Sequence, residues 1–104
     1  MTVLRVLYKS GFKFDEAYYK GTPLPMVGSI MGKHGVDHVE MVKVASAADG
    51  SKAPYQVIFS AYFHTAAGVQ AALTDPRIGE VMGDIANFHD GAPEVLVGEV
   101  VALP

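Results

Sequence analysis

Four short stretches of the chain are rich in β-branched and aliphatic residues, and at least one of them alternates between apolar and polar positions. Such stretches, bounded by glycine, proline or aspartate, are typical of β-strands with one face buried. We therefore expect strands over residues 2–8, 36–45, 55–64 and 94–103. The third of these, YQVIFSAYFH, carries the strongest strand pattern.

Between the first two strands the pattern changes to one broken helix, FDEAYYKGTPLPMVGSIMG, over residues 14–32. Asp15 and Glu16 stand where the first turn of a helix favours carboxylates. The Gly-Thr-Pro-Leu-Pro segment interrupts the helix, because a proline lacks the N–H and biases the residue before it away from helical geometry. We expect the helix to resume at Pro25 and to end at Gly32.

Two further helices are expected after the third strand. Thr65 is placed to cap an alanine-rich helix over residues 65–75, which Asp-Pro ends. Residues 77–88 carry apolar side chains at helical spacing and form the next helix.

The resulting order, β-α-β-β-α-(α)-β, predicts an α+β fold of the ferredoxin-like βαββαβ type. In that fold a four-stranded antiparallel sheet carries helices on one face only. The other face of a sheet this apolar would be exposed in a monomer. A second copy of the sheet is the simplest cover, so we expect a homodimer in the manner of a dimeric α+β barrel.

Composition limits the classes of function. The 104 residues fit one domain, 1–104, in which 50% are hydrophobic and 18% charged. A net charge of −3 makes a nucleic-acid partner improbable, and no window is apolar over the ~18 residues that a membrane span needs. The first residues show no signal peptide. The absence of cysteine fits a cytoplasmic protein.

Three segments together resemble the EthD family, whose name comes from ethyl tert-butyl ether degradation. They are VLY followed by FD..YY..TPLPMV, APY leading into AYF, and DIANFHD followed by GEVV. They span about Val3 to Val101. The resemblance implies a dimeric α+β barrel and an auxiliary role in ether degradation. Wider relatives of such a family include cofactor-free monooxygenases, lactone isomerases, decarboxylases and haem-degrading enzymes.

The chain departs from the family pattern at two positions. Where members have a histidine in a T-H-M-P-L pattern, this sequence has Pro23, so no role of that imidazole transfers. Where members read D-I-x-N-F-T-D, His89 replaces the threonine. The resemblance therefore supports the fold more strongly than any particular chemistry.

Tyr18, Tyr19 and Asp84 are the candidate catalytic residues. A phenol near a helix break can donate a hydrogen bond to a substrate inside an apolar pocket. Two adjacent helical residues cannot share a face, so at most one of the two tyrosines is expected to line such a pocket. Asp84, with Asn87 and Asp90, is also typical of residues that shape a helix end.

The same reasoning predicts apolar walls for the pocket, between the broken helix, the last helix and the sheet. The expected ligand-binding residues are Phe59, Phe63, Met82 and Phe88.

The four histidines do not form a metal-binding motif. His34 and His38 are four residues apart, but Gly35 lies between them where the helix is expected to have ended. His64 and His89 stand alone, and none of the four is preferred as a haem ligand. We expect no metal site and no cofactor.

Two functions remain open from the sequence. The chain is either a small cofactor-independent enzyme that acts on a hydrophobic or aromatic metabolite, or a non-catalytic binding or stress-associated dimer that holds such a molecule. The paired tyrosines favour a working pocket, and the missing histidine favours the second interpretation.

Overall fold

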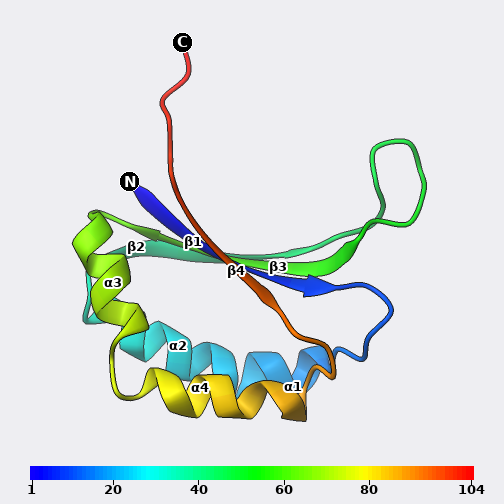
Figure 1. The fold of residues 1–104 in the computed structure, drawn as a ribbon, viewed down its shortest axis with the longest axis horizontal. Coiled ribbons are helices and arrows are strands. Elements are labelled where there is room, and N and C mark those ends of the chain that lie inside the picture. The colour runs from blue at the N-terminus through cyan, green and yellow to red at the C-terminus, as the bar shows by residue number, and fades with distance from the viewer.

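The computed structural model describes residues 1–104. The chain forms one antiparallel sheet with helices packed on one of its faces (Figure 1). The strands are β1 (Thr2–Lys9), β2 (Val36–Lys43), β3 (Tyr55–Phe63) and β4 (Glu94–Glu99), in the order β2-β3-β1-β4. The helices are α1 (Glu16–Gly21), α2 (Pro23–Gly32), α3 (Ala66–Leu73) and α4 (Ile78–Asp84), followed by the 3₁₀ turn η1 (Ile85–Asn87). The predicted ferredoxin-like α+β fold is confirmed.

The central strand β1 sets which side chains face the helices. Leu4 lies opposite both Ala61 of β3 and Val97 of β4, and directly opposed residues of an antiparallel pair project to the same face. Alternation then directs Leu4, Val6 and Tyr8 toward the helical layer. Leu4 and Tyr8 are buried there, with Phe59 and Phe63 of β3 nearby in the core.

The broken helix forms with a shorter interruption than the sequence predicted. The helix resumes at Pro23 rather than at Pro25, and only Thr22 separates α1 from α2. Both prolines fall in the first turn of α2, where no backbone N–H has a partner within the helix, so neither proline removes a hydrogen bond. At the start of α1, the Asp15 carboxylate accepts the Tyr18 N–H.

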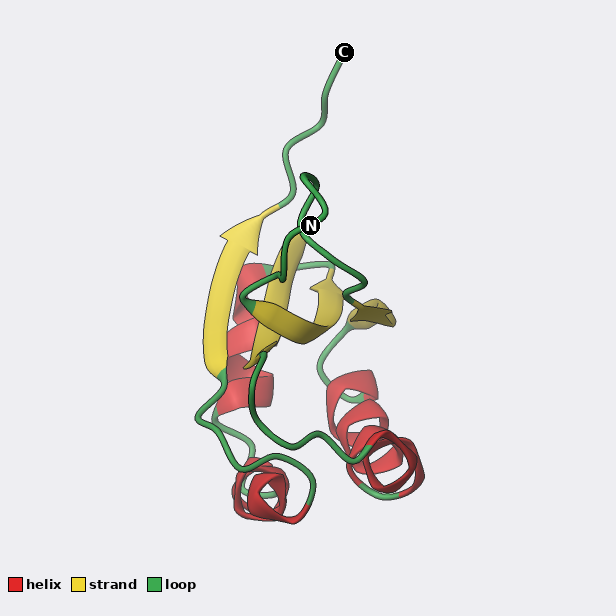
Figure 2. Ribbon diagram, turned by 90° about the vertical axis from the view of Figure 1, so that its right-hand side faces the viewer, coloured by secondary structure: helices red, strands yellow, loops and turns green.

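The last strand is shorter than expected. Residues 94–103 were predicted as a strand, but β4 ends at Glu99. The physical reason is pairing: β4 pairs only with β1, and Glu99 lies opposite Thr2. One further hydrogen bond, from the Val100 N–H to the Met1 carbonyl, ends the ladder. The residues after it project away from the helical layer (Figures 1 and 2).

The face of the sheet without helices carries a polar centre within an apolar border. Arg5 donates from Nε to Ser60 Oγ (3.1 Å) and from Nη2 to the Tyr62 hydroxyl (3.1 Å), which in turn donates to Glu40 Oε1 (3.0 Å). Around this network lie Leu96 and Val42, which are 55% and 45% exposed. We call this surface the open face.

No helix of the structure has the length and apolar character that crossing a membrane requires.

One glycine fixes how closely α3 can approach the end of α2. A Cβ on Gly68 would meet the backbone carbonyl oxygen of His34 in a severe clash, whereas a Cβ on Gly28, exposed within α2, would meet nothing. We expect Gly68→Ala to lower the free energy of unfolding by about 1–3 kcal/mol, because backbone atoms must shift. Gly28→Ala should raise it by about 0.5–1 kcal/mol, because alanine favours the helix. Urea unfolding followed by circular dichroism measures both, and equal effects of the two substitutions would contradict this packing.

Candidate functional site

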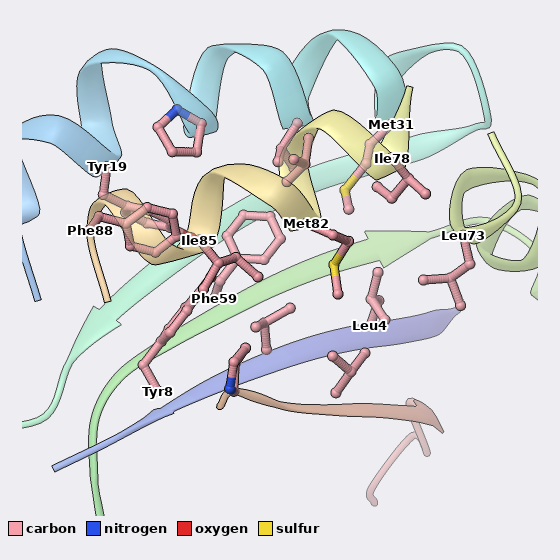
Figure 3. A pocket seen from close by; sticks show the side chains of 16 residues that line it. Leu4, Tyr8, Tyr19, Met31, Phe59, Leu73, Ile78, Met82, Ile85 and Phe88 are labelled. Atoms are coloured by element: carbon pink, nitrogen blue, oxygen red, sulfur yellow. The ribbon is translucent and has the colours of Figure 1, made fainter. Parts of the chain in front are cut away.

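A cavity lies between the sheet, α1, α2 and α4, and it encloses about 70 Å³ (Figure 3). Its floor comes from β1 and β3, and its roof comes from the helices. Pro93 and Val95 close one side, where the chain enters β4. The lining residues are Leu4, Val6, Tyr8, Tyr19, Pro23, Val27, Met31, Phe59, Leu73, Ile78, Val81, Met82, Ile85, Phe88, Pro93 and Val95.

The two ends of the cavity differ in chemistry. At one end the rings of Tyr8, Tyr19 and Phe88 gather, with ring centroids 4.9 Å apart for Tyr19 and Phe88 and 5.8 Å apart for the other two pairs. At the other end the walls are aliphatic or thioether side chains, among them Met31 and Ile78 (Figure 3). The cavity therefore has an aromatic end, which carries two hydroxyl groups, and an aliphatic end.

The two phenols at the aromatic end are held neutral. Burial raises the pKa of Tyr8 from its ordinary value of 10.0 to about 12, an effect that the neighbouring Tyr19 hydroxyl partly offsets. Burial, with a smaller contribution from Tyr8, also raises the pKa of Tyr19. Both groups stay protonated at neutral pH, so they can donate hydrogen bonds and are poor bases.

Met82 lies at the outer wall of the cavity. Its side chain lines the cavity, yet the residue is 53% exposed, and Val95 beside the opening is also exposed. Methionine is unbranched and changes conformation easily. The wall of the cavity at this position can therefore change shape through movement of the Met82 side chain.

Tyr18 and Asp84 lie outside the cavity and are joined to each other. The Tyr18 hydroxyl donates to Asp84 Oδ1 at 2.6 Å, and Asn87 Nδ2 donates to the same oxygen at 2.8 Å. The hydrogen bond to the carboxylate raises the pKa of Tyr18. These contacts connect α1 to the end of α4 and η1, so they hold two parts of the cavity roof together. Asp84 Oδ2 is buried and has no hydrogen-bond partner.

The candidate residues from the sequence divide into two sets. Tyr19, Phe59, Met82 and Phe88 line the cavity, whereas Tyr18 and Asp84 form the contact behind its wall. Phe63, expected in the pocket wall, is fully buried in the core cluster that includes Val69 and Ala72 of α3. Only one of the paired tyrosines lines the cavity, as their adjacent helical positions require.

Among the lining residues that the sequence reasoning missed, Tyr8 is the one with a polar group. A signal for it was present, since Arg5 is the only charged residue in the predicted strand 2–8. With Arg5 on the outer face, a period of two places Leu4, Val6 and Tyr8 on the buried face.

The histidines have separate structural contacts. His34 Nε2 lies 2.8 Å from Asp75 Oδ2, and hydrogen bonds from Arg77 and His34 lower the pKa of Asp75. His89 is 1% exposed, and its Nδ1 donates to the Lys13 carbonyl at 2.9 Å, while its Nε2 has no partner.

The other two histidines lie at the open face. His38 stacks on Tyr62 with ring centroids 4.4 Å apart, and His64 lies 3.6 Å from Asp37. No three His, Cys, Asp or Glu residues gather in a geometry that could hold a metal ion.

Comparison with known proteins identifies the fold and the family signature. The EthD domain model matches residues 13–92. An EthD-like protein from Ralstonia eutropha is 30% identical, with a TM-score of 0.83 over 97% of this chain and 92% of that one. An ethyl tert-butyl ether degradation (EthD) family protein from Bacillus halodurans is 17% identical, with a TM-score of 0.78 over 97% and 99% of the two chains.

A protein from Arabidopsis thaliana is 12% identical, with a TM-score of 0.70 over 99% of this chain and 97% of that one, which is a likeness of fold alone. No curated protein matches the chain.

The buried phenols should make the fold sensitive to alkali. In the unfolded chain Tyr8 ionises near pH 10.0, but in the folded protein it ionises near pH 12. Between these values the unfolded chain binds fewer protons, so the free energy of unfolding falls as pH rises, by about 1.4 kcal/mol per pH unit for this one group. Urea unfolding at pH 8 and pH 11 measures the fall.

Tyr8→Phe keeps the ring and removes the ionisation, so the decrease between pH 8 and pH 11 should be smaller in this variant. The same decrease in Tyr8→Phe and in the wild type would show that the Tyr8 hydroxyl is not buried as described. Tyr62→Phe is the matched control, because the Tyr62 hydroxyl lies at the open face, outside the cavity, and donates to Glu40 at 3.0 Å.

Proposed function

The chain belongs to the EthD family, and we propose that it binds a small hydrophobic or aromatic metabolite in the cavity between the sheet and its helices. The observation that carries the proposal is the lining of that cavity. Every side chain in it is apolar except for the hydroxyl groups of Tyr8 and Tyr19. Apolar walls with a few polar groups are typical of sites for small organic ligands.

The size of the cavity limits the ligand. Pockets for drug-sized ligands are usually about 300–1,000 Å³, and this cavity encloses about 70 Å³. The ligand is therefore small, or it enlarges the cavity on entry. Enlargement of the cavity at Met82 and Met31 requires little energy, because a thioether side chain changes conformation with little strain.

The proposal includes a homodimer in which the open face is buried against a second copy. Leu96 and Val42 are half exposed on that face in the single chain, and the apolar residues Val101 and Leu103 project beyond it at 73% and 85% exposed. A patch of this kind marks an interaction surface. A two-fold arrangement would cover the same patch on both copies at once.

Two activities fit a member of this family with such a pocket. Binding without turnover is favoured by the lining, which has no carboxylate, imidazole or amine to act as a base. The second activity is a cofactor-independent reaction, and Asp84 favours it. Such a reaction would be auxiliary to the degradation of an ether or another xenobiotic, or it would be of the monooxygenase, isomerase or decarboxylase type. Asp84 Oδ2, behind the cavity wall at the end of α4, is buried, has no hydrogen-bond partner and could accept a proton. Both keep the cavity as the binding site, and the cytoplasmic location remains a prediction.

Toluene is a suitable probe of the cavity, because it is small, aromatic and uncharged. We expect toluene to shift the methyl resonances of Met31 and Met82, which line the cavity, in a protein carrying ¹³C-methyl methionine. The resonances of Met1 and Met26, outside the cavity, should stay in place.

Ile78→Trp should weaken binding at least tenfold, because Ile78 lines the aliphatic end. Glu80→Trp is the control for Ile78→Trp, since Glu80 is exposed on the same helix and does not line the cavity. Toluene binding that is equal in the two variants, or absent from the wild type, would contradict the proposed site.

A substitution that places one charge on the open face tests the dimer. Leu96→Arg should convert a dimer of about twice the 11.1 kDa chain mass into a monomer, because the arginine would be buried without a partner. Ala17→Arg introduces the same side chain on the exposed side of α1 and should leave the dimer intact. Light scattering coupled to size-exclusion chromatography measures both masses, and a monomeric wild type would refute this arrangement.

A further inference from the structure

Tyr8 and Tyr19 carry the only side-chain O–H or N–H groups that line the cavity. They come from different elements, Tyr8 from β1 and Tyr19 from α1, and both are at most 4% exposed. Their rings meet edge to face with centroids 5.8 Å apart, and each hydroxyl influences the ionisation of the other. The fold thus brings two phenols together at one end of an otherwise apolar space.

The hydrogen-bonding capacity of this pair is not used up within the protein. Each hydroxyl has one hydrogen to donate, and neither pairs with a third residue. If one phenol donates to the other, the second still has a free hydrogen. At least one O–H hydrogen of the pair is therefore available to an acceptor on a ligand that enters the cavity.

Charge restricts what can satisfy that donor. No lysine, arginine or histidine lines the cavity, so an anionic ligand would lose its hydration without gaining a cation. No carboxylate or carbonyl side chain lines the cavity either. A ligand that only donates hydrogen bonds would therefore find no acceptor in the lining except the two phenol oxygens. A neutral oxygen acceptor fits both conditions.

We infer that the cavity selects a small uncharged molecule that places a carbonyl oxygen between the Tyr8 and Tyr19 hydroxyls and its hydrocarbon part toward Met31 and Ile78. This inference rests on the proposed function and adds the chemical class of the ligand. The raised pKa of Tyr8, about 12, agrees with a phenol that donates rather than ionises. Tyr8 and Tyr19 are then the residues that set specificity.

A pair of probes with the same shape isolates the carbonyl oxygen. Cyclopentanone and methylenecyclopentane differ in having C=O or C=CH₂ on the same ring. Both are titrated into the protein labelled with ¹³C-methyl methionine, and dissociation constants are taken from the Met31 and Met82 resonances. We expect cyclopentanone to bind about tenfold more tightly, the factor that about one net hydrogen bond supplies.

The variants assign that preference to the phenols. In Tyr8→Phe/Tyr19→Phe the two probes should bind with equal affinity, while Tyr62→Phe should keep the tenfold preference. Single variants at Tyr8 and Tyr19 replace the double variant if circular dichroism shows that the double variant is unfolded. A preference for the ketone that persists without both hydroxyls would overturn the assignment.

The wild-type titrations separate this inference from the proposed function. If both probes shift Met31 and Met82 with equal affinity, the cavity binds ligands but does not select a carbonyl, and the inference is wrong. If neither these probes nor toluene shift the two resonances, the cavity is not a ligand site, and the proposed function fails together with the inference.

Discussion

The structure depends on the position of β1 between β3 and β4. Because this strand is paired on both edges, its register fixes the two faces of the sheet at once. On one face it supplies Leu4, Val6 and Tyr8 to the floor of the cavity, and on the other it supplies Arg5 to the polar network of the open face. A shift by one residue would exchange these two sets. The candidate ligand site and the proposed dimer surface are therefore consequences of the same pairing.

The cavity exists because the helical layer consists of short, separate elements. Thr22 separates α1 from α2, and α4 is seven residues long before it tightens into the 3₁₀ turn η1. Such a layer cannot cover the sheet without a gap. The contacts of Asp84 with Tyr18 and Asn87 hold the two sides of the gap together, and Tyr19, next in sequence to Tyr18, faces inward. Tyr18 thus makes the contact in the cavity roof, and Tyr19 lines the cavity.

The sequence predicted the order of the elements well, because strand alternation and helix capping are local. Thr65, for example, caps α3 by accepting the Gly68 N–H, as its position indicated. Properties that depend on distant partners were harder to predict. β4 ends at Glu99 although apolar residues follow it in the sequence. Glu99 lies opposite Thr2, the first residue of β1, so the residues after it have no strand to pair with. Phe59 and Phe63 share one face of β3 and one core cluster, but only Phe59 also lines the cavity, a difference that the alternation along β3 does not predict.

Native mass spectrometry of the purified protein tests the account most directly, because it weighs the assembly and anything bound to it. The account predicts a dimer of the 11.1 kDa chain that, with cyclopentanone added, gains up to one ligand per chain. Partial denaturation should release chain and ligand together. A monomer that gains no ligand mass would contradict both the covered open face and the cavity as a binding site.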